Sequence, residues 1–196
     1  QDTPHYATRM TLPDPIGLLE DVMGVTERLL RPLCDKLTEH QTGARRLLLT
    51  LQRVDQVSQQ VELRLAAPMR DAARILPLFQ GGIEGVEAGY GIDMMRLEVT
   101  QAEVLPLQQI RTATQRSADP DRLNDLITRI GTRIGLENVQ RFLPADSHIP
   151  ERSFLIAPAA YSQPATGGWF CPRPLRLFPP EAIRAEGPVP PARFRW

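Results

Sequence analysis

Lysine, cysteine, histidine and aromatic residues are all scarce in this sequence. Lys36 is the only lysine, so 22 of the 23 basic residues are arginines. The two cysteines, Cys34 and Cys171, stand far apart with no further cysteine near either, which excludes a zinc pattern and a disulfide framework and leaves two buried or idle thiols. No apolar stretch approaches the roughly 18 residues of a membrane span. No signal segment opens the chain, so we expect a soluble, cytoplasmic protein.

Motifs that carry catalysis are also missing. The three histidines lie in unrelated segments, and neither HExxH, GxSxG, a phosphate-binding loop nor a dinucleotide fingerprint occurs. The one local cluster is DSHIPER (146–152), in which Asp146 and His148 are either metal ligands, an acid–base pair or parts of an ordered turn. No second ligand-rich segment supports a site. We therefore predict no catalytic residue, no metal and no cofactor.

Arginine is the feature that stands out among the residues present. The formal net charge is +0 at pH 7, so the chain as a whole does not attract nucleic acid. Guanidinium groups nevertheless make forked, bidentate bonds to phosphate that lysine cannot reproduce. The composition permits phosphate contact without demanding it, since a GC-rich gene produces the same bias.

The first part of the chain alternates between strands and helices. Asp14-Pro15 is typical of a helix start, and Gly43 of a helix end. Pro77 and the pair Gly81-Gly82 indicate that a second helix, beginning near Asp71, is short or broken. The predicted order is β-α-β-β-α-β: a four-stranded antiparallel sheet with two helices on one face, an α+β fold with strands at 5–12, 44–54, 57–66 and about 91–104.

The second part is richer in proline and harder to build from regular elements. Residues 108–119 are polar and indicate a linker between a domain at 1–107 and a region at 120–196. Asp119-Pro120 begins a third helix, which ends at Gly135, and 139–143 is a short strand. Beyond it we expect a mostly irregular, proline-rich arm. Because the chain starts at Gln1 without methionine and stops on RFRW, we expect it to be a piece of a longer protein.

Alternation along the predicted strands places polar side chains on one face of the sheet, open to water. Guanidinium, hydroxyl and amide donors of this kind bind phosphates, although the same pattern also describes an ordinary solvated sheet face. Paired aromatic residues for stacking on bases are missing, so any nucleic acid here is duplex, contacted through its backbone. The candidate DNA-backbone residues are Arg45, Arg46, Thr50, Gln52, Arg53, Arg64 and Arg96.

Several segments resemble a known family. The runs ARRLLLTLQRVD (44–55), RDAARILPLF (70–79) and GYGIDMMRLEV (89–99) resemble the little-finger domain of Y-family lesion-bypass DNA polymerases. The later strings RIGTRIGLENVQRFLPADSHIPERS (129–153), RPLRLFPPEAI (173–183) and PPARFRW (190–196) are similar to the segments that follow the little finger in the ImuB family of the bacterial mutasome. The resemblance covers nearly the whole chain.

The resemblance implies a non-catalytic adaptor in translesion DNA synthesis. Its implied partners are template-primer DNA, a RecA-like protein (ImuA), an error-prone polymerase (ImuC) and the sliding clamp. A clamp-binding peptide is only weakly matched, because Leu105 and Leu107 lack the glutamine before them and the aromatic residue after them. Candidate anchors for the RecA-like partner are Leu126, Ile130, Trp169, Phe170, Phe178 and Trp196. Two other functions stay open: the little finger of an active lesion-bypass polymerase, and a pure protein-interaction module.

Overall fold

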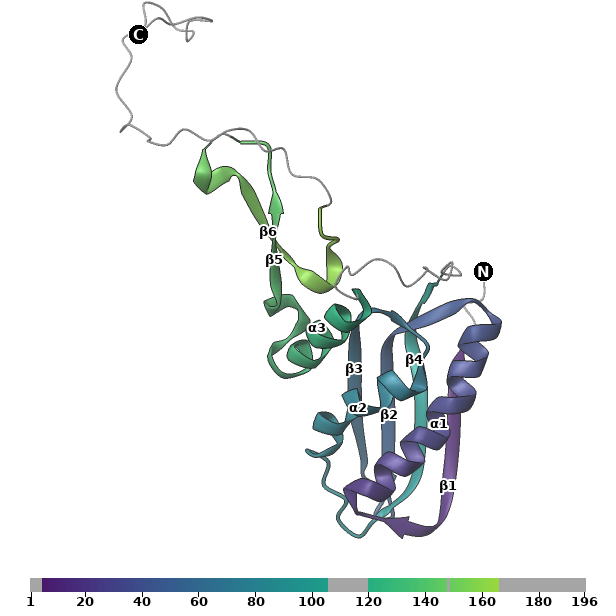
Figure 1. Ribbon diagram of the computed structural model, residues 1–196. Helices are drawn as coiled ribbons and strands as arrows, with labels where there is room; N and C mark the ends of the chain where they lie inside the picture. Colours follow the sequence, from purple (N-terminus) through teal and green to yellow (C-terminus); the bar gives the residue numbers. More distant parts are fainter. Residues whose placement is uncertain (1–4, 106–119, 148, 166–196) are drawn as a thin grey trace, which may run out of the picture.

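The first part of the chain forms a four-stranded antiparallel sheet in the order β1-β4-β2-β3 (Figure 1). The computed structural model describes residues 5–105, 120–147 and 149–165. The sheet and its two helices comprise β1 (Tyr6–Ile16), α1 (Leu19–Glu39), β2 (Thr42–Arg53), β3 (Ser58–Met69), α2 (Ala72–Ile83) and β4 (Ile92–Val104). The predicted α+β architecture and its β-α-β-β-α-β order are therefore confirmed.

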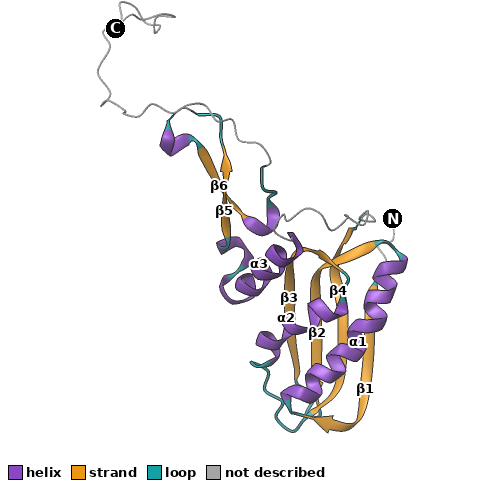
Figure 2. Ribbon diagram, viewed as in Figure 1, coloured by secondary structure: helices purple, strands orange, loops and turns teal. Residues whose placement is uncertain are grey.

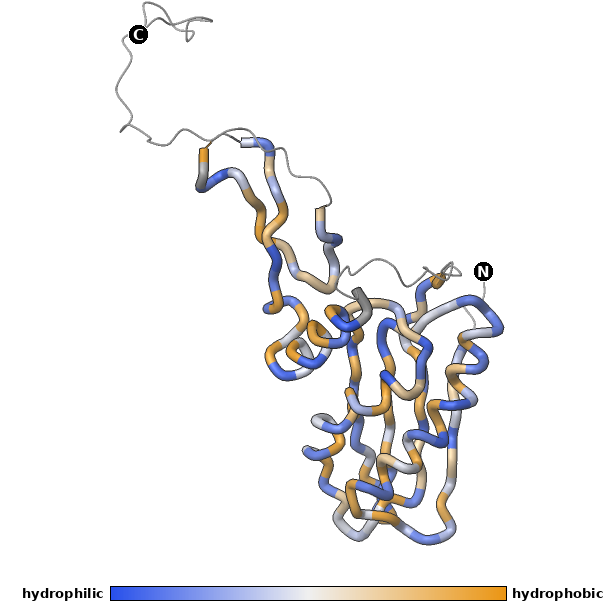
Figure 3. Tube along the Cα trace, in the orientation of Figure 1, coloured by the Kyte–Doolittle hydropathy of each residue, from blue (hydrophilic) through white to orange (hydrophobic). Residues whose placement is uncertain are grey.

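Alternation of side chains along the strands separates a core face from an open face. Leu47, Leu49 and Leu51 of β2 are fully buried, whereas the residues between them are only partly covered. Figure 3 shows hydrophobic and hydrophilic residues alternating along the central strands. Both α1 and α2 pack on the core face (Figure 2), and α1 contributes the buried stripe of Val22, Val25, Leu29, Leu33 and Leu37. Burial of such side chains stabilises the fold by roughly 1.5–3 kcal/mol each.

The helix start predicted at Asp14-Pro15 is wrong. β1 continues past a register shift until Ile16 pairs with Ile92, and α1 begins only at Leu19. Pro15 is tolerated because it lies on an edge strand, in the irregular stretch between Thr11 and Ile16 where β1 has no assigned partner in β4. Strand pairing overrides the local capping signal, and Leu18, which would lie in the predicted helix, is exposed ahead of α1.

Gly43 does not end the first helix either. α1 ends at Glu39, and Gln41 adopts the left-handed conformation (φ 54°) that we assigned to a glycine. Gly43 lies inside β2, where a Cβ would come within 2.9 Å of the Met69 nitrogen. The glycine is required for close approach of two strands rather than for a helix cap.

The second helix is less disturbed than predicted. α2 runs from Ala72 to Ile83 through both Pro77 and the glycine pair, and the Asp71 side chain caps it by accepting a hydrogen bond from Ala73 N–H at 2.9 Å. Gly82 fits because α2 packs closely on the sheet: a Cβ there would collide with Val61. Burial of this face compensates for the poor helix propensity.

After residues 106–119, which lie outside the described ranges, the chain forms a smaller unit beside the edge of β3. It comprises α3 (Pro120–Ile134), η1 (Leu136–Asn138), β5 (Gln140–Pro144), η2 (Pro150–Arg152), β6 (Phe154–Pro158) and η3 (Ala159–Tyr161). β5 and β6 pair as an antiparallel ribbon. The predicted helix and short strand are confirmed, but residues 154–161 are more regular than the irregular arm that we expected.

A second apolar cluster joins this unit to the sheet. Ala66 of β3 packs with Ile127, Leu136, Ala159 and Ala160, and the buried Thr128 hydroxyl accepts a hydrogen bond from Ala66 N–H at 2.9 Å. On the neighbouring helix, Arg74 forms an ion pair with Asp125 at 2.8 Å. α3 thereby covers one end of the β3 edge. Within the described ranges, no helix is long and apolar enough to cross a membrane.

Candidate nucleic-acid interface

The face of the sheet opposite α1 and α2 presents a continuous row of polar side chains. The strand register places Arg9 opposite Arg96, Arg96 opposite Thr50, and Thr50 opposite Gln60. Residues directly opposite in neighbouring strands point to the same face, so this row crosses all four strands. It presents two guanidinium groups, a hydroxyl and an amide, the donor types that bind phosphate oxygens.

Two glutamates interrupt the positive charge in the adjacent row. Glu98 forms an ion pair with Arg96 at 2.7 Å, and Glu62 forms ion pairs with Arg64 at 3.0 Å and with Arg46 at 3.2 Å. The hydrogen bond from Arg64 to Glu62 raises the pKa of Arg64, so this guanidinium stays charged. These arginines are exposed to solvent, and exposed ion pairs contribute at most about 1 kcal/mol, so phosphate can compete with the glutamates.

Arg9 is the functional candidate that our sequence reasoning missed. It is exposed on β1 and has no hydrogen-bond or ion-pair partner within the part of the chain that the structure describes. The signal was present in the sequence, since Ala7, Arg9 and Thr11 alternate with the more apolar residues of the predicted strand 5–12. Arg9 is the free cation at the β1 end of the row.

Arg45 does not lie on the open face. Its side chain is only 10% exposed and its guanidinium donates to Leu65 C=O at 2.9 Å and to Ala160 C=O at 3.1 Å. It also pairs with Glu103 at 3.0 Å and lies over the Tyr161 ring. A register shift in β2 between Ala44 and Arg46 accompanies this placement. Arg45 joins the sheet to the smaller unit. Its guanidinium N–H groups are used in hydrogen bonds within the chain rather than offered to phosphate.

Two further candidates lie at the turn between β2 and β3. Arg53 is largely covered, forms an ion pair with Asp55 at 2.6 Å, and packs so closely on Gly89 that a Cβ there would collide with its guanidinium. Gln52 donates to the Gln56 side chain at 3.2 Å. The arrangement gathers Arg9, Arg46, Thr50, Arg64 and Arg96 across the open face, while Arg45 and Arg53 make contacts elsewhere.

The smaller unit presents apolar rather than charged candidates. Leu126 and Ile130 lie one helical turn apart on α3 and are 50% and 40% exposed. On the ribbon, Phe142 and Ile156 face the same side and both are exposed, and the Phe142 and Phe154 rings meet edge-on at 4.9 Å. The remaining predicted anchors, Trp169, Phe170, Phe178 and Trp196, lie outside the described residues.

The other candidates are placed only in part. Leu105 follows β4 and donates its N–H to Gln41 C=O at 2.9 Å, whereas Leu107 and the predicted linker 108–119 lie outside the described residues. His148 is also outside them, and the described residues contain no cluster of three metal-ligating side chains. Cys34 is buried in the core, and burial raises the pKa of its thiol to about 11, which keeps it protonated and unreactive.

Comparison with known sequences assigns the family. The impB/mucB/samB family C-terminal domain matches residues 4–119, more than half of the chain and the whole described sheet. The chain belongs to this family. The ImuB proteins of Caulobacter vibrioides strains NA1000 and ATCC 19089 are each 33% identical to it over 196 residues, covering 96% of this chain and 43% of the relative. The chain therefore spans less than half the length of these curated relatives.

Solved structures of Y-family polymerases are also similar to this member of the impB/mucB/samB family. The little finger domain of PolIV, solved in complex with the beta-clamp processivity factor, is 19% identical and covers 58% of this chain and 100% of its own, with a TM-score of 0.42. A Dbh polymerase ternary complex is 6% identical and covers 48% of this chain and 28% of its own, with a TM-score of 0.43. The 33% identity to the two ImuB proteins confirms the similarity that the sequence segments indicated.

Proposed function

We propose that this chain is a non-catalytic adaptor piece of a translesion DNA synthesis complex. In this proposal the open face of the sheet contacts the DNA backbone, and residues 120–196 contact a RecA-like partner of the ImuA type. An error-prone polymerase of the ImuC type and the sliding clamp belong to the same assembly. Membership of the impB/mucB/samB family and similarity to ImuB support this role.

The row of donors across the sheet is the observation that carries the DNA contact. Arg9, Arg96, Thr50 and Gln60 lie side by side on four strands, and Arg46 and Arg64 flank them near the β3 edge. Neighbouring strands are about 4.8 Å apart, so the row spans about 14 Å, enough to reach several phosphates of one duplex. The described strands place no aromatic side chain on this face, and the exposed Tyr161 lies only at its margin beside Arg46 and Arg64, in accord with contacts to the backbone alone.

Replacing Arg9 and Arg96 together by alanine is expected to reduce the salt dependence of duplex DNA binding. Each phosphate contact contributes about 0.9 to the slope of log K against log salt concentration, so losing two lowers it by roughly 2. The measurement is fluorescence anisotropy of a labelled duplex titrated with the whole chain at several salt concentrations. The matched control is Arg31→Ala, which removes an exposed arginine from α1, on the opposite face. An equal slope for wild type and the double variant would rule out DNA contact by this row.

Exposed apolar residues on α3 and the ribbon favour a protein contact by the smaller unit. Leu126, Ile130 and Phe142 are large side chains at the surface, and a two-stranded ribbon alone is marginally stable in water. Buried aromatic and aliphatic anchors supply much of the binding energy of protein interfaces. These residues are therefore the described part of the proposed partner surface.

The partner contact predicts a clear difference between two lengths of chain. Residues 1–196 are expected to co-purify with the RecA-like partner, and residues 1–110 are expected to lose that binding, because the shorter piece lacks the whole smaller unit. Duplex binding by the shorter piece checks that its sheet is folded. Equal recovery of the partner with both lengths would place the contact on the sheet domain instead.

A further inference from the structure

The edge of β3 carries backbone groups that nothing in the described chain uses. Arg53 N–H donates to Val57 C=O at 2.9 Å and closes the hairpin, so odd-numbered residues of β3 hydrogen-bond to β2. Because the direction alternates along a strand, the N–H and C=O groups of Gln60, Glu62 and Arg64 point outward. The described residues give the outward backbone groups of these three no hydrogen-bond partner.

This free stretch is bounded at both ends. At one end the Thr128 hydroxyl takes the outward N–H of Ala66, as the edge passes under α3. At the other end the Gln59 side chain donates to Glu87 C=O at 2.5 Å and accepts from Glu87 N–H at 3.1 Å. α3 thus satisfies the Ala66 amide at one end, and the Gln59 side chain holds the loop at Glu87 against the strand at the other. The five residues between them, Gln60–Arg64, form an open window.

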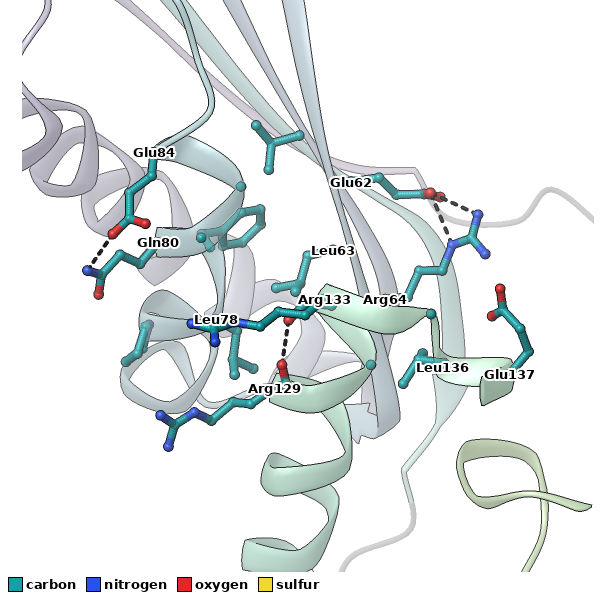
Figure 4. A pocket seen from close by; sticks show the side chains of 18 residues that line it. Glu62, Leu63, Arg64, Leu78, Gln80, Glu84, Arg129, Arg133, Leu136 and Glu137 are labelled. Carbon is teal, nitrogen blue, oxygen red and sulfur yellow. Dashed lines mark hydrogen bonds and ion pairs between the residues drawn. The ribbon is translucent and has the colours of Figure 1, made fainter. Parts of the chain in front are cut away.

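A groove of about 680 Å³ runs along this window (Figure 4). Val61–Arg64 form its floor, the second half of α2 forms one wall, and the end of α3 with η1 forms the other. Small residues keep it open: a Cβ at Gly81 would meet no atom within 4 Å. Leu78 supplies an apolar contact beside the strand, so the groove offers both backbone pairing and a place for an apolar side chain.

Charge on the helix side of the groove favours an acidic occupant. Arg129 and Arg133 are exposed, line the groove and have no hydrogen-bond or ion-pair partner for their guanidinium groups in the described segments. Figure 4 shows Arg133 extending toward Leu78 and α2. On the opposite side, Arg64 is already paired with Glu62. Every second side chain of a strand added to this edge would point to the helix side of the sheet, where Arg129 and Arg133 lie.

We propose that the β3 edge between Gln59 and Ala66 is a docking site for an extended segment of a partner protein. The segment adds a fifth strand to the sheet, places an apolar side chain near Leu78 and Gly81, and places an acidic side chain beside Arg129 and Arg133. A single strand fits the window, whereas a second copy would bring its whole sheet and its α3 against the α3 that closes one end. This site shares Arg64 with the open face that contacts DNA in the proposed function, but its α2 wall lies on the other side of the sheet.

Selection of random twelve-residue peptides displayed on phage, with the immobilised whole chain as bait, tests this site. Enriched peptides are expected to carry an apolar and an acidic residue two positions apart, on the same face of the added strand, and to bind Gly81→Leu at least tenfold more weakly. Gly24→Leu is the matched control, since a Cβ at Gly24 in α1 also meets no atom within 4 Å. The charge-reversed variant Arg129→Glu/Arg133→Glu is expected to bind about tenfold more weakly. Absence of any peptide that discriminates Gly81→Leu from Gly24→Leu would overturn the proposal.

Strand addition has its own signature. The bound peptide is expected to slow hydrogen exchange at the amides of Glu62 and Arg64. N-methylation of every second peptide residue is expected to abolish binding when the methylated amides face β3, and to be tolerated when they face away. Equal binding by the two sets of N-methylated peptides would contradict backbone pairing. Concentration-dependent dimers that Gly81→Leu dissociates would assign the edge to a second copy and overturn the proposal. Duplex binding by Gly81→Leu is expected to equal that of the wild type, which separates this site from the DNA-binding face.

Discussion

Replacing Phe79 by alanine is expected to lower the free energy of unfolding by about 3–5 kcal/mol. Phe79 is fully buried where α2 packs on the sheet, and truncation leaves a cavity that neighbouring leucines cannot fill without moving. A domain of this size is stable by roughly 5–15 kcal/mol, so the variant loses a large part of its stability. Urea unfolding followed by circular dichroism measures the change.

Tyr90→Ala is the matched control for this prediction. It also truncates an aromatic side chain, but Tyr90 is 84% exposed whereas Phe79 is 0% exposed. Its effect is expected to stay within about 0.5 kcal/mol, as for other surface substitutions. Similar losses for the two variants would mean that Phe79 does not pack in the core as described here.

Replacing Arg45 by alanine is expected to cost about 2–4 kcal/mol and to loosen the smaller unit from the sheet. The change leaves the C=O groups of Leu65 and Ala160 without their charged donor, and each such loss in a covered site costs about 1–3 kcal/mol. The partner Glu103 is more exposed, so its ion pair adds little. Unfolding in urea measures the cost, and hydrogen exchange locates it.

Exchange is expected to accelerate at residues 127–128 and 159–161 and to stay slow in the centre of the sheet. Arg31→Ala provides the control, because it removes an arginine whose ion pair with Glu27 lies on the exposed side of a helix. That pair is expected to contribute about 0.3–0.5 kcal/mol. Uniform acceleration across the whole chain would show that Arg45 supports the core rather than the junction.

The sheet and its helices were predictable because their apolar patterns are long and regular. The hairpin of β2 and β3 alternates over more than ten residues, and α1 carries its apolar stripe from Val22 to Leu37, about four turns. The boundaries were less predictable, since Asp14-Pro15 carries a strong local helix signal that strand pairing at Ile16 overrides. Gly43 does not end a helix and Gly82 does not break one. Both glycines are required by close packing, which has no local signature in the sequence.

The candidate site was predictable only as a face, not as a set of contacts. Alternation placed Arg46, Arg64 and Arg96 on one side, and the structure has them there. The same rule failed for Arg45, because a register shift in β2 removes it from the face and the smaller unit covers it. The groove at β3 was not predictable at all, since sequence alternation does not reveal which strand lies at an edge or which helix covers it.

The strand order has a consequence for biosynthesis. Among the four strands of this sheet β1 is synthesised first, but its one partner is β4, and Tyr6 pairs with a residue as distant as Val99. The β2–β3 hairpin can form early, whereas the first strand stays without a partner until almost the whole sheet has been translated. If translation stops before β4, the edge of β2 that β4 would cover stays unpaired, and so does β1. Such an exposed strand edge is prone to aggregation. Completion of this fold is a single late event, set by the arrival of one strand in the middle of the sheet.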